Sequence, residues 1–503
     1  MSRKHKKAGI RLRAGRTSAD LGRLVAEEDA NLEKYYVRRD RYVDRAKNFD
    51  DQASFFVGPK GAGKSAILQM LRLDNKTSPS RIINLSPKQL AFSAFSNIGL
   101  PSSLLIDANK KQWLYKSLWD YIISTEVGSR EYTDDSSYLA FFKRFVRGKG
   151  ERQIRRLLNL RFDDNGNIES LSNRFLKLIK EIELSGKVGN EIAQVGGKVS
   201  MDLEALAKKG QFELLGLVHE VSARLADTVT NNYYILIDDL DVDWHNEPVQ
   251  NEIIAAMFAS LRKVCRPPHL KCVVSIQDRI FRELPIEHKD KFRDSLCTVD
   301  WEADIVREMI DKRIKHIVDI PHAKIWDGLF PKSGFPFIWS RIGGRPREAI
   351  RLASICLETA RKNGHSCVSE EDLRVASKVF SNERIEDIGS ELGYIYPGFT
   401  TFLKCFSGGH KEFPVVKIKD AVDHCILKSH DEPSPSYVWI RGYENAFFDI
   451  ARVMLENQIL LFKRTRKDIP AIYDPAEHDM YDNHAFVAFH PMYVSGLGLI
   501  SND

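Results

Sequence analysis

Residues 58–65, with the sequence GPKGAGKS, carry the clearest chemistry in the chain. Their spacing matches G-x-x-x-x-G-K-[ST], the pattern of a loop that binds nucleotide phosphates. Its glycines let the backbone curl so that successive N–H groups point at a phosphate, and the helix that follows adds the positive end of its dipole. The run lies between an apolar stretch, 54–57, and a helix-forming stretch, 66–73, as the motif requires. We therefore predict that nucleotide phosphates bind at Gly58, Pro59, Lys60, Gly61, Ala62, Gly63, Lys64, Ser65 and Ala66.

Three side chains of this loop have distinct predicted roles. Lys64 is expected to reach the β- and γ-phosphates, where its charge assists catalysis. The hydroxyl of Ser65 is expected to hold Mg²⁺. Lys60 leaves two interpretations open: it adds positive charge to the phosphate site, or it is a loop lysine that faces solvent.

A pair of carboxylates supplies the acidic half of the predicted metal site. The apolar run YYILI, 233–237, is typical of a buried strand, and Asp238 and Asp239 follow it directly. Ligands of open α/β sheets bind at this carboxyl edge of the strands. We predict that Asp238 is the magnesium partner and that Asp239 orients or deprotonates the attacking water.

A second strand is predicted to follow the acidic one. The helix-like stretch 251–264 separates the apolar runs 233–237 and 271–276, so the order strand, helix, strand predicts a βαβ unit in a parallel sheet. If the second strand lies beside the strand of the phosphate loop, the polar residue at its end faces the γ-phosphate. Gln277 is favoured for this contact, with Ser275 as the alternative.

The predicted fold class is α/β: a P-loop NTPase parallel sheet with a large helical insertion, a helical lid and a C-terminal winged-helix-like α+β domain. After residue 395, short helices and then the strand-like runs ILLFKR, AIYD and AFVAF give the element order of a winged helix. The predicted parts are a basic flexible tail (1–16), a helical leader (17–50), the P-loop core (51–301) with its insertion at about 80–225, the lid (302–380) and the C-terminal domain (381–503).

Three segments resemble AAA+ and STAND-type P-loop ATPases, particularly the bacterial group with tandem-Asp Walker B motifs related to KAP. They are GPKGAGKS, ILIDDLD (235–241) and GGRPREAIRLA (343–353), the last being similar to the sensor 2 region of an AAA+ lid. The resemblance implies ATP and Mg²⁺ as cofactors, ATP hydrolysis and a homo-oligomer. It implies that Arg347, with Arg345 second, contacts the phosphates from the lid. It also implies that Arg293 is an arginine finger that completes a neighbour's site.

The sequence departs from this family in two respects. A large insertion divides the two Walker motifs, because 174 positions separate Lys64 from Asp238. Asp239 stands where the family usually has Glu, and the shorter acid implies slow hydrolysis. The leader AEEDANLEKYYVRRD, 26–40, is similar to that of ATPases found beside phage-defence genes. The resemblance therefore implies a regulatory or sensor switch that acts with a separate effector protein in antiviral defence.

The distribution of charge points to an alternative function. The chain has 75 Lys and Arg against 69 Asp and Glu, and residues 1–16 hold seven of the basic residues and no acid. This tail and a predicted basic wing would contact DNA phosphates. The wing residues are Lys463, Arg464, Arg466 and Lys467. The alternative is thus an ATP-gated DNA-binding loader or initiator resembling origin-recognition or transposition ATPases. A small-molecule kinase, a third interpretation, is disfavoured by the tandem Asp and the lid-like arginine.

Composition excludes several other classes of protein. With 43% hydrophobic and 29% charged residues the chain is neither disordered nor a disulfide scaffold, and its seven scattered cysteines are expected to be reduced. No stretch approaches the roughly 18 to 20 consecutive apolar residues that span a bilayer. We expect a cytoplasmic protein that does not enter the membrane.

Overall fold

The computed structural model describes most of the chain outside the predicted tail and insertion. The described residues are 10, 20–37, 39–52, 54–74, 81–85, 108–131, 215–242 except 217, 220, 221, 224 and 226, then 244–264, 268–286, 288–318, 325–393, 395–431, 440, 447–474, 477–481 and 485–501. The chain forms two compact units. The first contains Met1–Val37, Lys60–Gly63 and Asp300–Asp503, and the second contains Arg38–Pro59 and Lys64–Val299.

A five-stranded parallel sheet organises the second unit. Its strand order is β2-β3-β4-β1-β5, and every neighbouring pair is parallel. The first four strands are rich in Phe, Val, Ile and Leu, and β3 is buried along its whole length, as expected where both faces of a sheet are covered. The strands are β1 (Phe55–Gly58), β2 (Arg81–Leu85), β3 (Tyr233–Ile237), β4 (Leu270–Gln277) and β5 (Leu296–Thr298).

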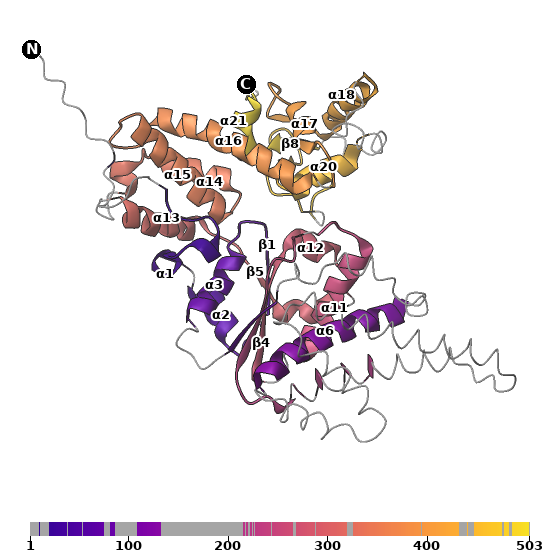
Figure 1. Cartoon of the computed structure of the whole chain (residues 1–503). Coiled ribbons are helices and arrows are strands. Elements are labelled where there is room, and N and C mark those ends of the chain that lie inside the picture. Colours follow the sequence, from indigo (N-terminus) through magenta and orange to yellow (C-terminus); the bar gives the residue numbers. More distant parts are fainter. Residues whose placement is uncertain are drawn as a thin grey trace, which may run out of the picture. The chain divides into compact units, whose positions relative to one another are not determined.

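Helices cover both faces of this sheet. Figure 1 shows α2 (Asp44–Lys47) and α3 (Lys64–Asp74) on one face, and α6, α11 and α12 on the other. These last three helices span Ala108–Glu131, Pro248–Val264 and Asp278–Glu283. The indole Nε1 of Trp119 on α6 donates to the carbonyl of Ile253 on α11 at 2.9 Å, which fixes the two helices together. The layered α/β arrangement confirms the predicted fold class.

The predicted strands at 54–57, 233–237 and 271–276 are confirmed as β1, β3 and β4. The edge strands β2 and β5 were not predicted, and β5 has only three residues. In the insertion, the apolar face of KQWLYKSLWDYIIS, 111–124, predicts a helix, and α6 confirms it. The sequence also favours helices near 152–160 and 170–184 and a hairpin near 188–203, which lie outside the described residues. Cys272 is disulfide-bonded, so the expectation of reduced thiols is wrong at this position.

The lid and the C-terminal domain of the first unit share one hydrophobic core. It runs from Val306 and Ile310 to Tyr493 and Leu497. Figure 1 shows α16 (Glu370–Leu392) extending from beside α15 (Pro346–Lys362) to beside α21 (Pro491–Leu497). Since α16 is continuous, the boundary that we predicted between residues 380 and 381 falls inside a helix. The lid helices are α13 (Ala303–Ile317), α14 (Gly334–Ile342), α15 (Pro346–Lys362) and α16 (Glu370–Leu392).

The C-terminal domain has the topology expected of a winged helix. Its small antiparallel sheet has the order β6-β8-β7, and three helices are interleaved with the strands. AIYD makes only an isolated bridge, between Phe462 and Ala471, instead of the expected strand. The elements are α17 (Phe399–Lys404), β6 (Glu412–Pro414), α18 (Ile418–Asp431), α20 (Phe447–Glu456), β7 (Leu460–Lys463), β8 (Phe486–Phe489) and α21 (Pro491–Leu497).

The leader forms short helical turns, among them α1 (Leu32–Tyr35) and α2, in place of one or two longer helices. A buried arginine of α13 holds its first part. The Nη1 of Arg313 donates to the carbonyl of Leu21 at 2.8 Å and lies 3.3 Å from the carboxylate of Asp29. In the described part of the chain, no helix is both long enough and apolar enough to cross a bilayer.

Candidate nucleotide-binding site

The lysine of the phosphate loop folds back on the start of its own loop. β1 ends at Gly58, and α3 begins at Lys64. The Lys64 side chain is buried, and its Nζ donates to the carbonyls of Gly58 and Pro59, both at 2.9 Å. The two carbonyl oxygens thus occupy the ammonium group that the motif assigns to phosphates.

Two glycines of the loop need the conformational freedom that only glycine has. Gly61 and Gly63 have φ values of +82° and +86°, in the left-handed region that side chains disfavour. A Cβ at Gly61 would also lie 3.3 Å from the Cβ of Arg347, and one at Gly63 would lie 3.6 Å from the ring of Trp301. The backbone is thus curled as the predicted phosphate loop requires.

The tip of the loop packs against the lid within the first unit. The backbone N–H of Arg347 donates to the carbonyl of Gly61 at 3.3 Å, and the indole Nε1 of Trp301 donates to that of Ala62 at 2.8 Å. The sensor 2-like segment therefore contacts the loop through the backbone of Arg347, whereas the resemblance implied a contact of its side chain with the phosphates. The contact of Trp301 was missed, because no motif marks this residue.

Lys60 also contacts the lid. Its Nζ lies 3.1 Å from the carboxylate of Glu391 near the end of α16, and its side chain is 43% exposed. Neither of the two interpretations left open by the sequence included this ion pair. Since Glu391 lies 331 positions away in the chain, only the fold brings the two residues together.

The two candidate lid arginines differ in their surroundings. Arg345 is the N-cap residue of α15 and is buried, with its guanidinium charge acting on Glu348 and His490. Arg347 is only partly buried, at the second position of the same helix. The more accessible Arg347 remains the better candidate for a phosphate contact, in the order that we predicted.

The strand ends of the second unit meet at one edge of the sheet. β4 lies between β1 and β3, with Gly58 opposite Gln277 and Ile237 opposite Val274. Asp238 directly follows Ile237, so Asp238 and Gln277 both leave the sheet at the edge where the phosphate loop begins. Ser275 instead is buried inside β4, which favours Gln277 over Ser275.

The backbone after β3 is strained at the predicted catalytic acid. Asp239 has a φ of +60°, which is uncommon for a residue other than glycine. Its N–H donates to the carboxylate of Asp238 at 3.0 Å. Strain of this kind is found at active sites, where it fixes the direction of a functional side chain. The turn leaves Asp239 exposed and Asp238 partly buried.

A link between β4 and the segment after β3 was not predicted. The Nε2 of Gln277 donates to the carboxylate of Asp241 at 2.5 Å. The position of Asp241 after the strand predicts only that it caps or solvates a turn. Its carboxylate instead holds the amide of Gln277, leaving the amide oxygen and the second N–H for other partners.

Arg293 lies in the short 3-10 helix Lys289–Ser295 before β5, and its side chain is exposed. In the described part of the chain, no ion pair involves it. An exposed arginine is available to a second molecule, as the predicted role requires.

One of the four predicted wing cations is not on the wing. Lys463 is the last residue of β7; it is buried, and its Nζ donates to the carboxylate of Glu412 on β6. Its predicted DNA contact is therefore wrong, because the Lys463 ammonium is buried in an ion pair with Glu412 and does not face solvent. Arg464, Arg466 and Lys467 are exposed at the turn that follows.

The side chains present suit Mg²⁺ bound together with a nucleotide. Among the described residues, no group of three or more His, Cys, Asp or Glu could hold a metal. Magnesium is commonly held by one or two protein oxygens together with substrate phosphates and water. The hydroxyl of Ser65 and the carboxylate of Asp238 are oxygen ligands of the kind that this mode of binding uses.

Part of the lid matches a known family. Residues 304–389 match the family described as "FunZ-associated C-terminal helical domain". This range contains α14 and α15 and most of α13 and α16. The match covers less than a fifth of the chain and leaves the phosphate loop outside it.

A curated protein matches a longer part of the chain. The chain is 23% identical over 388 residues to the "Putative transposon gamma-delta 80.3 kDa protein" of Escherichia coli (strain K12), covering 73% of this chain and 50% of that protein. It therefore spans about half the length of this curated relative.

Two solved structures resemble the chain over nearly its whole length. The ORC1 protein of Aeropyrum pernix in complex with DNA has 10% identity and a TM-score of 0.38, over 95% of this chain and 96% of that chain. A Walker-type ATPase of Pyrococcus abyssi has 11% identity and a TM-score of 0.38, over 92% and 96%. TM-scores this low say nothing about the function of the chain.

Proposed function

We propose that this chain is a Mg²⁺-dependent ATP-binding and ATP-hydrolysing switch of AAA+ or STAND type. The observation that carries the proposal is the curled loop between β1 and α3, with Lys64 at the start of the helix and left-handed glycines at positions 61 and 63. The neighbouring strand ends add Asp238 and Gln277 at the same edge of the sheet.

Each residue has a role in this proposal. Lys64 leaves the carbonyls of Gly58 and Pro59 and binds the β- and γ-phosphates. Magnesium, held by Ser65 and Asp238, supplies charge that neutralises the phosphate oxygens. The strained turn directs the carboxylate of Asp239 to hold the attacking water and accept its proton.

Switching follows from the contacts of the loop tip. Gly61 and Ala62 accept hydrogen bonds from Arg347 and Trp301, and Lys60 pairs with Glu391. A nucleotide that rearranges the loop therefore alters contacts with α15 and α16. The nucleotide shifts the equilibrium between the two states by the difference between their affinities for it.

Three further features belong to the proposal. Hydrolysis is slow because Asp239 is shorter than glutamate. Arg293 completes the site of a neighbouring copy in a homo-oligomer. The switch regulates a separate effector protein in antiviral defence, a setting that rests on the resemblance of the leader alone.

Steady-state ATP turnover tests the site assignment. We expect Asp239→Asn to lose at least about 100-fold in turnover while still binding ATP, since removing a positioned base typically costs 10²–10⁴-fold. Lys64→Ala is expected to lose both binding and turnover. Equal turnover in the wild type and both variants would refute the assignment.

The shared site has its own test. Turnover per chain should rise with protein concentration in the wild type, and Arg293→Ala should abolish this rise. Lys291→Ala, which removes an exposed cation from the same short helix, is the matched control. A wild-type rate per chain that does not depend on concentration would contradict the role of Arg293.

An ATP-gated DNA binder is the second candidate. It is favoured by the winged-helix topology, by the three exposed cations after β7, and by a relative whose name associates it with a transposon. Phosphate contacts position a protein on DNA and make its affinity depend on salt. In this candidate, ATP binding controls the contacts that the wing and the N-terminal tail make with DNA.

Salt titration of DNA binding distinguishes the two candidates. Neutralising Arg464, Arg466 and Lys467 together should make the plot of the logarithm of the DNA association constant against the logarithm of salt concentration less steep. The slope should fall by about 2 to 3, at about 0.9 per phosphate contact. The matched control neutralises three exposed lysines on other elements, Lys315, Lys378 and Lys404. The same slope in both triple variants would exclude the wing as a DNA contact.

A further inference from the structure

Two cysteine thiols of the C-terminal domain lie in sulfur contact. Cys405 is the C-cap residue of α17, and Cys425 lies on α18. Their Sγ atoms are 3.2 Å apart. The sulfurs of a disulfide are about 2.05 Å apart, so an approach of about 1 Å would join them.

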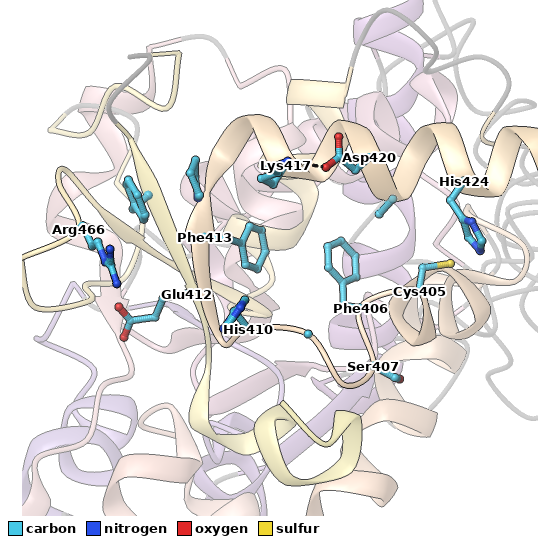
Figure 2. A pocket seen from close by; sticks show the side chains of 14 residues that line it. Cys405, Phe406, Ser407, His410, Glu412, Phe413, Lys417, Asp420, His424 and Arg466 are labelled. Atoms are coloured by element: carbon cyan, nitrogen blue, oxygen red, sulfur yellow. Dashed lines mark hydrogen bonds and ion pairs between the residues drawn. The ribbon is translucent and has the colours of Figure 1, made fainter. Parts of the chain in front are cut away.

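The two thiols differ in their access to solvent. Cys425 is 1% exposed, whereas Cys405 is only partly buried. Cys405 also lines a pocket of about 780 Å³ between α17, β6 and α18. Figure 2 shows it at the opposite end of the pocket from Arg466. A small oxidant that enters the pocket therefore reaches Cys405 first.

The other free cysteines that the structure describes lack this combination. Cys297 and Cys356 are buried, and burial raises the pKa of both thiols, which slows their reactions. Cys367 is exposed. Among the thiols that the structure describes, only that of Cys405 combines access to solvent with a second sulfur in contact.

We propose that Cys405 and Cys425 form an oxidation site, at which hydrogen peroxide converts the two thiols to a disulfide. The sulfur of Cys405, as thiolate, attacks one peroxide oxygen. An S–O bond forms, the O–O bond breaks, and the leaving hydroxide takes up a proton as water. The sulfur of Cys425 then attacks that of Cys405. The S–S bond forms, the S–O bond breaks, and a second water leaves with the proton of Cys425.

Oxidation changes the connectivity of the C-terminal domain. The new bond joins the end of α17 to α18 and closes a ring that contains β6 and much of the pocket wall. Peroxide is the electron acceptor, and two waters are the only other products. None of the proposed nucleotide contacts lies in this ring.

Peptide mapping of the full chain tests the proposal. The protein is treated with hydrogen peroxide, alkylated without reduction, digested and analysed by mass spectrometry. We expect one cross-linked peptide pair that contains Cys405 and Cys425, lacks two hydrogens, and disappears on reduction. Cys367→Ser, which removes an exposed thiol elsewhere, should form the same pair at an unchanged rate.

The single variants identify the order of the two steps. In Cys425→Ser, peroxide should leave a sulfenic acid on Cys405 that a dimedone probe traps, whereas Cys405→Ser should leave Cys425 reduced. The proposal is overturned if both thiols of the wild-type protein stay open to alkylation after peroxide. Conversion of Cys405 to sulfinic acid while Cys425 stays free would also overturn it.

Discussion

At the scale of single residues, the phosphate loop is held by contacts that a nucleotide must rearrange. The ammonium of Lys64 is bound by two carbonyls of its own loop, and Lys60 is bound by Glu391. Both cations are thus occupied by oxygens of the protein. In the proposed function, phosphates compete with these oxygens, so the contacts would lower the apparent affinity for ATP.

Glu391→Gln is expected to tighten Mg-ATP binding by about 2- to 5-fold. The pair is partly exposed and is therefore worth at most about 1 kcal/mol. The variant releases the charge of Lys60 for the nucleotide, and a titration with a fluorescent ATP analogue measures the change. Glu386→Gln on the same helix, whose carboxylate lies 3.9 Å from Lys404, should leave the affinity unchanged. Weaker binding in Glu391→Gln would contradict this account.

The sequence anticipated the residues that a local motif defines and missed those that only the fold brings together. The loop 58–65 and the strand ends at Asp238 and Gln277 were identified from short-range spacing. Trp301 and Glu391 contact the loop from positions hundreds of residues away in the chain. No periodicity or motif encodes such contacts.

At the scale of elements, the start of α21 joins the C-terminal domain to the lid. The Nδ1 of His490, the N-cap residue, accepts a hydrogen bond from the N–H of Met492 at 3.2 Å. Burial, together with the nearby charges of Arg345 and Arg341, lowers the pKa of His490 to about 3. The imidazole is therefore neutral in the folded protein at neutral pH.

Acidification should destabilise the first unit through His490. An unfolded histidine has a pKa of about 6.5, so below that pH the unfolded chain takes up a proton that the folded chain does not. The contribution to the free energy of unfolding is constant above about pH 6.5 and falls by about 2 kcal/mol at pH 5.

Denaturation of the wild type and of His490→Asn at pH 5 and pH 7.5 measures this contribution. Asparagine keeps a side-chain acceptor for the N–H of Met492 and does not titrate. Between pH 7.5 and pH 5, the free energy of unfolding of the variant should therefore fall by about 2 kcal/mol less than that of the wild type. Equal losses in both proteins would show that His490 takes up its proton in the folded state as well.

At the scale of the whole chain, periodicity predicted elements better than boundaries. The buried strands β1, β3 and β4 were identified, since uninterrupted apolar runs are typical of a parallel sheet. The three-residue strands β5 and β6 were not, because they are too short to show a period. Composition changes near residue 381, yet α16 continues to Leu392 and shares its core with the C-terminal domain.

The central claim is that Mg-ATP binds at the loop 58–65 and that its binding does not require hydrolysis. Calorimetric titration of Mg-ATP into Asp239→Asn and into the double variant Lys64→Ala/Asp239→Asn tests it most directly. The account predicts saturable binding of one ATP per chain to the single variant, abolished when Mg²⁺ is chelated, and no measurable binding to the double variant. Equal affinity in the two proteins would place the nucleotide elsewhere and contradict the account.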